Sequence, residues 1–288
     1  MPKSNPNVLV IGASGRFASL VIPELVRRGA TVRAFVRDPG KESVVRMNGA
    51  AEVAVGDLRD RPSLERALQG IDGVFHIGPA FVADEADLGI SVVEAARRSG
   101  VGKIVFSSVI HPTNVRLANH ASKIPVEDAI FASGIDYTIL HPAMFFQNIA
   151  TGWQSVNERG VFTEPFPIGT RIARVDYRDV AEAAAIALTE DRLAFGTFEL
   201  CAAMLDRSEI AAVMSDVLGR PIEPGEAPFD EWAAHLPLEL GQKELLAKVF
   251  ESYAASGSGG NSLVLRAVLG REPRSLRQYI GELASAAS

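Results

Sequence analysis

The feature that most constrains the fold is a run of four aliphatic residues, Val8 to Ile11, that ends at Gly12 and leads directly into a helical pattern. This order predicts a strand, a tight turn and a helix start. Glycine at position 12 allows a sharp turn, and Gly15 lets the backbone approach a ligand that a Cβ atom would hold away. The free N–H groups at a helix N-terminus suit a pyrophosphate. A glycine turn between a strand and a helix is common, so this motif alone favours a cofactor loop and an ordinary turn equally.

Composition narrows the class of protein. The chain has 288 residues, of which 47% are hydrophobic and 22% charged, and these are the values of an ordinary globular protein. A net charge of -6 argues against nucleic acid as a ligand. The single cysteine, Cys201, excludes an intrachain disulfide, and the five histidines show no ligand pairing, so no metal site is expected. No apolar run reaches about 18 residues. We therefore expect a cytoplasmic protein with a small-molecule substrate and no membrane partner. We also consider that the chain forms a homodimer.

Strand and helix patterns alternate through the first half of the chain. After the opening strand, apolar strand patterns occur at residues 31–36, 52–55, 73–77, 103–106 and 137–140, and helical patterns at 17–28, 62–68, 86–98 and 122–133. Pro23 predicts either a kink in the first helix or a short first turn. Such alternation predicts an α/β fold with a doubly wound parallel sheet of the Rossmann type, in which ligands lie at the carboxyl ends of the strands.

The alternation weakens beyond about residue 145. Residues 171–175 and 196–200 read as strands, residues 208–218, 228–235, 238–253 and 275–283 as helices, and residues 254–262 as a flexible linker or loop. We expect a dinucleotide-binding domain over residues 1–145, with residues 171–190 returning to it, and a smaller substrate or lid region over residues 146–288. Five aromatic residues of this region allow two interpretations, a pocket wall for a flat substrate or an ordinary second core: Phe145, Phe146, Trp153, Phe162 and Phe166.

The end of the second strand pattern distinguishes the two nicotinamide dinucleotides. An acidic residue there would bind the ribose 2′-OH of NAD, whereas a cation accommodates the 2′-phosphate of NADP. Arg37 occupies this end, Lys41 follows it, and Arg16 lies in the glycine loop. Guanidinium groups bind phosphate through paired hydrogen bonds, so the three cations favour NADP(H) over NAD(H). The alternative is that Arg37 is a solvated turn residue neutralised by Asp38.

An ordered set of motifs carries a family resemblance over about residues 7 to 220. The set comprises Val10-Ile11-Gly12-Ala13-Ser14-Gly15, Val36-Arg37-Asp38-Pro39, Gly56-Asp57-Leu58, His120-Ala121-Ser122-Lys123, Val126-Glu127, Tyr137-Thr138-Ile139-Leu140-His141-Pro142 and Val175-Asp176-Tyr177-Arg178-Asp179-Val180-Ala181. In these motifs the chain resembles the NmrA-like branch of the atypical short-chain dehydrogenase/reductase superfamily, which includes quinone and dye reductases as well as regulatory dinucleotide sensors.

The resemblance implies which residues contact a cofactor. It places Asp57 and Leu58 beside the adenine, Gly78 and Pro79 along the cofactor, and Pro142 to Phe145 near the nicotinamide. With the loop and strand-end residues, the expected cofactor-binding set is Gly12, Ala13, Ser14, Gly15, Arg16, Phe17, Arg37, Lys41, Asp57, Leu58, Gly78, Pro79, Lys123, Pro142 and Phe145.

Lys123 is the main catalytic candidate. A lysine on the helix after the fifth strand would reach the nicotinamide ribose, and its charge would stabilise an oxyanion. The superfamily's usual tyrosine lies four positions earlier, where this chain has Asn119. His120, or His111 in the preceding loop, is a candidate proton donor, and Ser108 is a candidate for orienting a carbonyl group. The alternatives are that the histidine only caps the helix and the serine only ends a strand.

Two functions follow from these residues. The first is an NADPH-dependent oxidoreductase that transfers a hydride to a quinone, an enone or a similar aromatic or carbonyl acceptor. The second, motivated by Asn119, is a non-catalytic NADP(H)-binding redox sensor that acts through a protein partner. An isomerase or dehydratase is disfavoured, because such chemistry depends on the tyrosine that this chain lacks.

Overall fold

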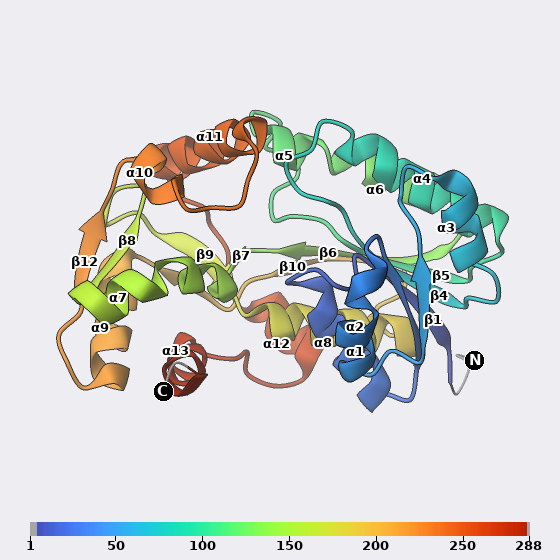
Figure 1. Cartoon of the computed structure of the whole chain (residues 1–288), viewed down its shortest axis with the longest axis horizontal. Coiled ribbons are helices and arrows are strands. Elements are labelled where there is room, and N and C mark those ends of the chain that lie inside the picture. The colour runs from blue at the N-terminus through green and yellow to red at the C-terminus, as the bar shows by residue number, and fades with distance from the viewer. Residues whose placement is uncertain (1–4, 287–288) are drawn as a thin grey trace. The chain divides into compact units, whose positions relative to one another are not determined.

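The computed structural model describes residues 5–286, which form two compact units (Figure 1). The first unit comprises residues 5–141 and 180–198, and the second comprises residues 142–179 and 199–286.

The first unit is built on a seven-stranded sheet. Its strands are β1 (Asn7–Ile11), β2 (Thr31–Val36), β3 (Glu52–Val55), β4 (Gly73–Ile77), β5 (Lys103–Ser107), β6 (Asp136–Pro142) and β10 (Gly196–Leu200). The spatial order is β10-β6-β5-β4-β1-β2-β3, and the five neighbouring pairs from β6 to β3 are parallel. The chain therefore moves outward from β1 in one direction through β2 and β3, and in the other through β4, β5 and β6.

Helices cover both faces of this sheet, which explains the continuous apolar runs of its central strands. Figure 1 shows α3, α4 and α6 along one face, and α1, α2 and α8 along the other. The helical elements are η1 (Ala18–Leu20), α1 (Val21–Arg27), η2 (Pro39–Lys41), α2 (Glu42–Met47), α3 (Arg61–Ala67), α4 (Glu85–Arg98), α5 (Ala118–Ala121), α6 (Ile124–Ala132) and α8 (Tyr177–Thr189). Val8, Leu9 and Val10 are fully buried between the two layers. The doubly wound α/β sheet predicted from the alternation is confirmed.

The first helix is shorter than its apolar pattern suggests. Residues 18–20 form a 3-10 turn, and α1 begins only at Val21. Pro23 then lies in the first turn of α1, where the missing N–H group breaks no helical hydrogen bond. Of the two readings of Pro23, the short first turn is the observed one.

Helices α4 and α6 approach each other closely at a glycine. A Cβ atom on Gly89 would lie 2.4 Å from Cγ2 and 2.9 Å from Cγ1 of Val126, which is completely buried. This contact fixes the start of α6, where Lys123 and Glu127 lie one turn apart.

We expect Gly89→Ala to destabilise the protein by about 1–3 kcal/mol, because overpacking outweighs the gain in helix propensity. The measurement is the midpoint of urea-induced unfolding. Gly281→Ala in α13 (Leu276–Ala286) is the control, since a Cβ atom there meets nothing within 4 Å. The control variant should unfold at a higher urea concentration than the wild type, and an unchanged midpoint for Gly89→Ala would contradict the packing argument.

The second unit contains two small sheets and several helices. Strand β9 (Ile172–Val175) pairs with β7 (Met144–Phe145) and β11 (Ala203–Leu205), and β8 (Val161–Glu164) pairs with β12 (Glu223–Glu226). The helical elements are η3 (Phe146–Gly152), α7 (Trp153–Arg159), α9 (Arg207–Leu218), α10 (Phe229–Ala233), α11 (Leu240–Ser256), α12 (Leu263–Leu269) and α13.

Two segments differ from the sequence-based expectation. Residues 172–175 do not join the main sheet, because both neighbours of β9 lie in the second unit; only residues 180–198 group with the first unit. Residues 254–262 are not a free linker. Residues 254–256 complete α11, and the Ala173 N–H group donates to the Ser258 carbonyl oxygen at 2.7 Å. Gly257, with a φ of +65°, makes the turn that allows this pairing.

The aromatic residues after position 145 mainly fill cores. Phe146, Trp153 and Phe162 pack with α9 and α13 in one buried cluster, and Phe166 packs against Phe250 in another. The ordinary-core interpretation therefore describes these four residues. Within residues 5–286, no helix is long and apolar enough to cross a membrane.

Candidate functional site

The site lies where the strand order of the main sheet reverses. Because β1 lies between β2 and β4, the loops that leave β1 and β4 diverge to opposite faces of the sheet and open a crevice. A cavity of about 410 Å³ occupies this crevice. Ten of the predicted cofactor-binding residues line it: Gly12, Ser14, Gly15, Arg16, Phe17, Arg37, Asp57, Leu58, Gly78 and Pro79.

The glycine loop forms one wall of the cavity. Gly12 has a φ of +68°, a conformation that favours glycine, and its carbonyl oxygen accepts a hydrogen bond from the Gly15 N–H group at 2.8 Å. A Cβ atom on Gly15 would lie 3.0 Å from that oxygen, so glycine is needed for the turn itself. Ala13 is buried behind the wall, where its N–H group donates to the Phe35 carbonyl oxygen at 3.3 Å.

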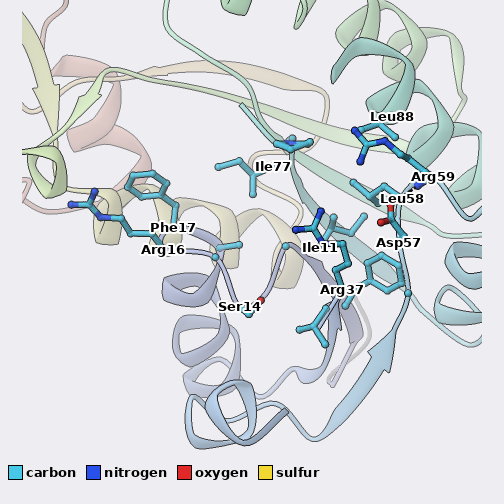
Figure 2. Close-up of a pocket in the computed structure, with 18 residues that line it drawn as sticks. Ile11, Ser14, Arg16, Phe17, Arg37, Asp57, Leu58, Arg59, Ile77 and Leu88 are labelled. Carbon is cyan, nitrogen blue, oxygen red and sulfur yellow. Dashed lines mark hydrogen bonds between the residues drawn. The ribbon is translucent and has the colours of Figure 1, made fainter. Parts of the chain in front are cut away.

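The cations of the pocket are divided between its two ends. Figure 2 shows Arg16 with Phe17 at one end, and Arg37 with Asp57 and Arg59 at the other. The Arg16 guanidinium lies 5.5 Å from the centroid of the Phe17 ring. The sequence-based argument for NADP(H) counted Arg16, Arg37 and Lys41 together, whereas in the structure Arg16 and Arg37 lie at opposite ends of the pocket.

Arg37 is exposed and available for a ligand. Within residues 5–286 it has no ion pair or hydrogen bond through its side chain, because Asp38 instead accepts from the Gly40 N–H group at 2.8 Å as the N-cap of η2. The adjacent Arg59 is different, since its guanidinium makes two 2.8 Å hydrogen bonds to the Asp84 carboxylate. The structure therefore contradicts the interpretation of Arg37 as a turn residue neutralised by Asp38. Lys41 is exposed at the end of η2 and does not line the cavity.

Lys123 lies next to the cavity wall in a buried ion pair. Its Nζ atom contacts the Glu85 carboxylate, and the Lys123 and Glu85 side chains are only 9% and 4% exposed. A Cβ atom on Gly78 would lie 3.7 Å from Lys123 Nζ and 3.3 Å from Glu85 Oε1. Gly78 lines the cavity, and because it has no side chain, only its backbone separates this ion pair from the pocket.

Ser108 lies in the same row across the carboxyl edge of the sheet. The register pairs Ile77 with Ser107, so the next residues, Gly78 and Ser108, follow on neighbouring strands. The Ser108 hydroxyl donates to Glu127 Oε1 at 2.5 Å, and His141 Nε2 lies 2.9 Å from the same oxygen. All three side chains are buried, and they connect β5, α6 and β6.

His120 is poorly placed to donate a proton. Its Nδ1 atom lies 3.0 Å from the His111 carbonyl oxygen, which can only accept, so Nδ1 carries the proton of the neutral ring. Burial, together with the nearby His111 and Lys123 charges, lowers the pKa of His120 and favours that neutral ring. Nε2 is then a bare acceptor, and it is buried without a hydrogen-bond partner among the described residues.

Other predicted residues lie outside this group. Pro142 and Phe145 belong to the second unit, where the Phe145 ring packs edge-on against Tyr177 with centroids 4.7 Å apart. Their expected place near a nicotinamide stays a prediction. His76 at the end of β4 stacks on Phe106, and burial lowers its pKa to about 3, so it remains neutral.

Sequence reasoning missed the acidic partners. Glu85, Asp84 and Glu127 bind side chains that are 14 to 38 positions away in the chain, a separation at which no local pattern operates. Only Glu127 carried a signal, because it lies four residues after Lys123 and hence on the same face of α6.

The comparison with known proteins gives the family. The NmrA-like family model matches residues 4–280, nearly the whole chain. The chain belongs to the NmrA-like family.

Two proteins similar in sequence to this NmrA-like chain and one protein that shares its fold have names that describe reductases or oxidoreductases. An NAD(P)H azoreductase of Xenophilus azovorans is 29% identical over 254 residues, which are 86% of each chain. The crystal structure of an NADPH-dependent quinone oxidoreductase of Escherichia coli in complex with NADPH superposes with a TM-score of 0.83, at 25% identity and over 96% of this chain and 99% of that one. The triphenylmethane reductase of Citrobacter sp. complexed with NADP(H) shares the fold, with a TM-score of 0.82 at 23% identity and the same coverage.

Proposed function

We propose that this NmrA-like protein is an NADPH-dependent reductase whose acceptor is a quinone, an enone or another flat conjugated compound. The observation that carries the proposal is the cavity at the strand-order reversal. Arg37, which has no partner within residues 5–286, lies at one end of it, and the Lys123–Glu85 pair lies next to its Gly78 wall. The azoreductase and the quinone oxidoreductase named above add support, because their names describe them as dependent on NAD(P)H and on NADPH.

The residues present fit a dinucleotide. The cradle formed by Gly12 and Gly15 has no side chain where a pyrophosphate would lie, and the cavity volume falls in the range of small-molecule sites. Arg37 would bind the 2′-phosphate, Asp57 and Leu58 would flank the adenine, and Lys123 would donate to the ribose hydroxyls beside Gly78. Arg16, at the other end, would lie along the cofactor beyond the adenosine.

NADPH supplies the hydride when it is bound, so the protein's own residues need only bind, orient and balance charge. The Lys123 charge would stabilise negative charge that develops on the acceptor. A conjugated acceptor takes up a hydride readily and needs little acid assistance, which is compatible with Asn119 at the position of the usual tyrosine.

The test is NADPH oxidation, followed by absorbance, with a panel of quinones, enones and azo compounds. We expect turnover of at least one acceptor, with NADPH preferred to NADH. Protein that binds NADPH in a fluorescence titration but oxidises it no faster than background with every acceptor would contradict the proposal. That outcome, together with a partner protein captured in only one cofactor state, would favour the non-catalytic sensor.

A further inference from the structure

Glu127 and His141 form a buried hydrogen-bonded pair next to Ser108, and hydride transfer from NADPH gives this pair no role. Glu127 Oε1 is shared by the Ser108 hydroxyl and His141 Nε2, and Glu127, Ser108 and His141 are buried residues, with 9%, 7% and 7% of their surface exposed. Burying a carboxyl group, an imidazole and a hydroxyl together is costly unless each is satisfied. Apolar residues at the ends of β5 and β6 would form this part of the core without that cost.

The strand register directs this connection toward the cofactor pocket. Strands β4, β5 and β6 are adjacent and parallel, so Gly78, Ser108 and His141 form a row where these strands end. Helix α6 lies beside this edge, with Lys123 one turn before Glu127. The order across the edge is therefore the cavity wall, then Ser108, then Glu127 and His141.

We propose that the His141–Glu127 pair is the proton source of the reduction and that Ser108 delivers the proton to the acceptor. This inference rests on the proposed reductase function. It assigns Ser108 the contact with the acceptor, and it makes Glu127 and His141 positioning residues that act through Ser108. It also supplies a proton donor in a chain that has Asn119 at the position of the superfamily's usual tyrosine.

The proton and electron balance is complete with groups already named. A hydride from NADPH adds to the conjugated acceptor, the cofactor is oxidised to NADP⁺, and an electron pair is left on the acceptor's oxygen or nitrogen. The Ser108 hydroxyl, which donates to Glu127 Oε1 in the structure, turns toward the acceptor, and its O–H bond breaks as the new bond to that atom forms. Ser108 Oγ takes the proton held between Glu127 Oε1 and His141 Nε2, and that pair then regains one proton from water.

His120 does not compete for this role. Its Nδ1–H group is committed to the His111 carbonyl oxygen, and its Nε2 atom has no proton to give in the neutral ring. Among the described residues, the titratable side chain that contacts Glu127 is His141 on β6, whereas Lys123, one turn earlier, is ion-paired with Glu85 of α4. Ser108, from β5, is the other polar side chain that contacts the Glu127 carboxyl group.

The test uses Glu127→Gln in the full-length protein, because glutamine keeps the size and the acceptor oxygen but cannot pass on a proton. We expect turnover with the best acceptor to fall about 100-fold or more, while the Kd for NADPH changes less than about twofold. In the wild type, the rate should fall as the pH rises. This limb of the pH profile should be absent from the variant.

Two further variants separate a proton path from a structural role. Ser108→Ala combined with Glu127→Gln should be no slower than the slower single variant, because both residues act in one path; multiplied losses would overturn the proposal. Glu94→Gln, on the exposed side of α4, is the matched control and should leave the rate unchanged. Wild-type turnover with an unaffected Glu127→Gln variant overturns this inference alone, whereas absence of wild-type turnover overturns it together with the reductase function.

Discussion

Replacement of Lys123 by methionine should lower the free energy of unfolding by about 3–5 kcal/mol, because it leaves the buried Glu85 carboxylate without its partner. The same variant should lose about 100-fold or more in turnover, since it removes the cation beside the Gly78 wall of the cavity. Urea-induced unfolding and steady-state NADPH oxidation measure the two effects separately.

The double variant Lys123→Met/Glu85→Gln distinguishes the two roles of this pair. Removing both charges should restore most of the lost stability, because no unpaired charge then remains buried. Turnover should stay low, since the cation is still absent. If the double variant regains activity together with stability, Lys123 is only a structural residue.

Arg37→Ala should weaken NADPH binding about 10–100-fold and leave NADH binding nearly unchanged. At this end of the cavity, Arg59 is paired with Asp84, whereas the Arg37 guanidinium has no protein partner among the described residues. A hydrogen bond to a charged group contributes about 1.5–3 kcal/mol. Titrations of both cofactors, followed by protein fluorescence, give the two dissociation constants.

Arg16→Ala is the control for that experiment, because Arg16 lies at the opposite end of the pocket. Its loss should weaken NADPH and NADH binding by the same factor, since the two cofactors differ only at the 2′ position. Equal losses for both cofactors in Arg37→Ala would refute the assignment of Arg37 to the 2′-phosphate.

The main sheet could be predicted because its signals are local. Each central strand is buried on both faces, so it reads as a largely apolar run, and Gly12, Gly29 and Gly100 mark the turns with positive φ angles. The cavity wall was predictable for the same reason, since the carboxyl ends of parallel strands meet at one edge.

The second unit and the buried acidic residues were less predictable because they depend on distant partners. Strand β12 contains Pro224 and Gly225, which are rare within strands, and it forms only through pairing with β8 more than 50 residues earlier. Glu85 and Glu127 read as solvated helix residues until the fold brings Lys123 and Ser108 to them. A short polar pattern carries no information about such contacts.

The burial of Cys201 has a practical consequence for labelling experiments on the two units. Its thiol is fully enclosed, with Sγ 3.0 Å from the position of a Cβ atom on Gly260, and burial raises its pKa. The thiolate is the form that reacts with labelling reagents, so we expect the wild-type chain, whose single cysteine is buried, to remain unlabelled. Cysteines introduced at Met47 and Leu240, which are 79% and 74% exposed in different units, would accept a pair of fluorophores for single-molecule distance measurements with and without NADPH.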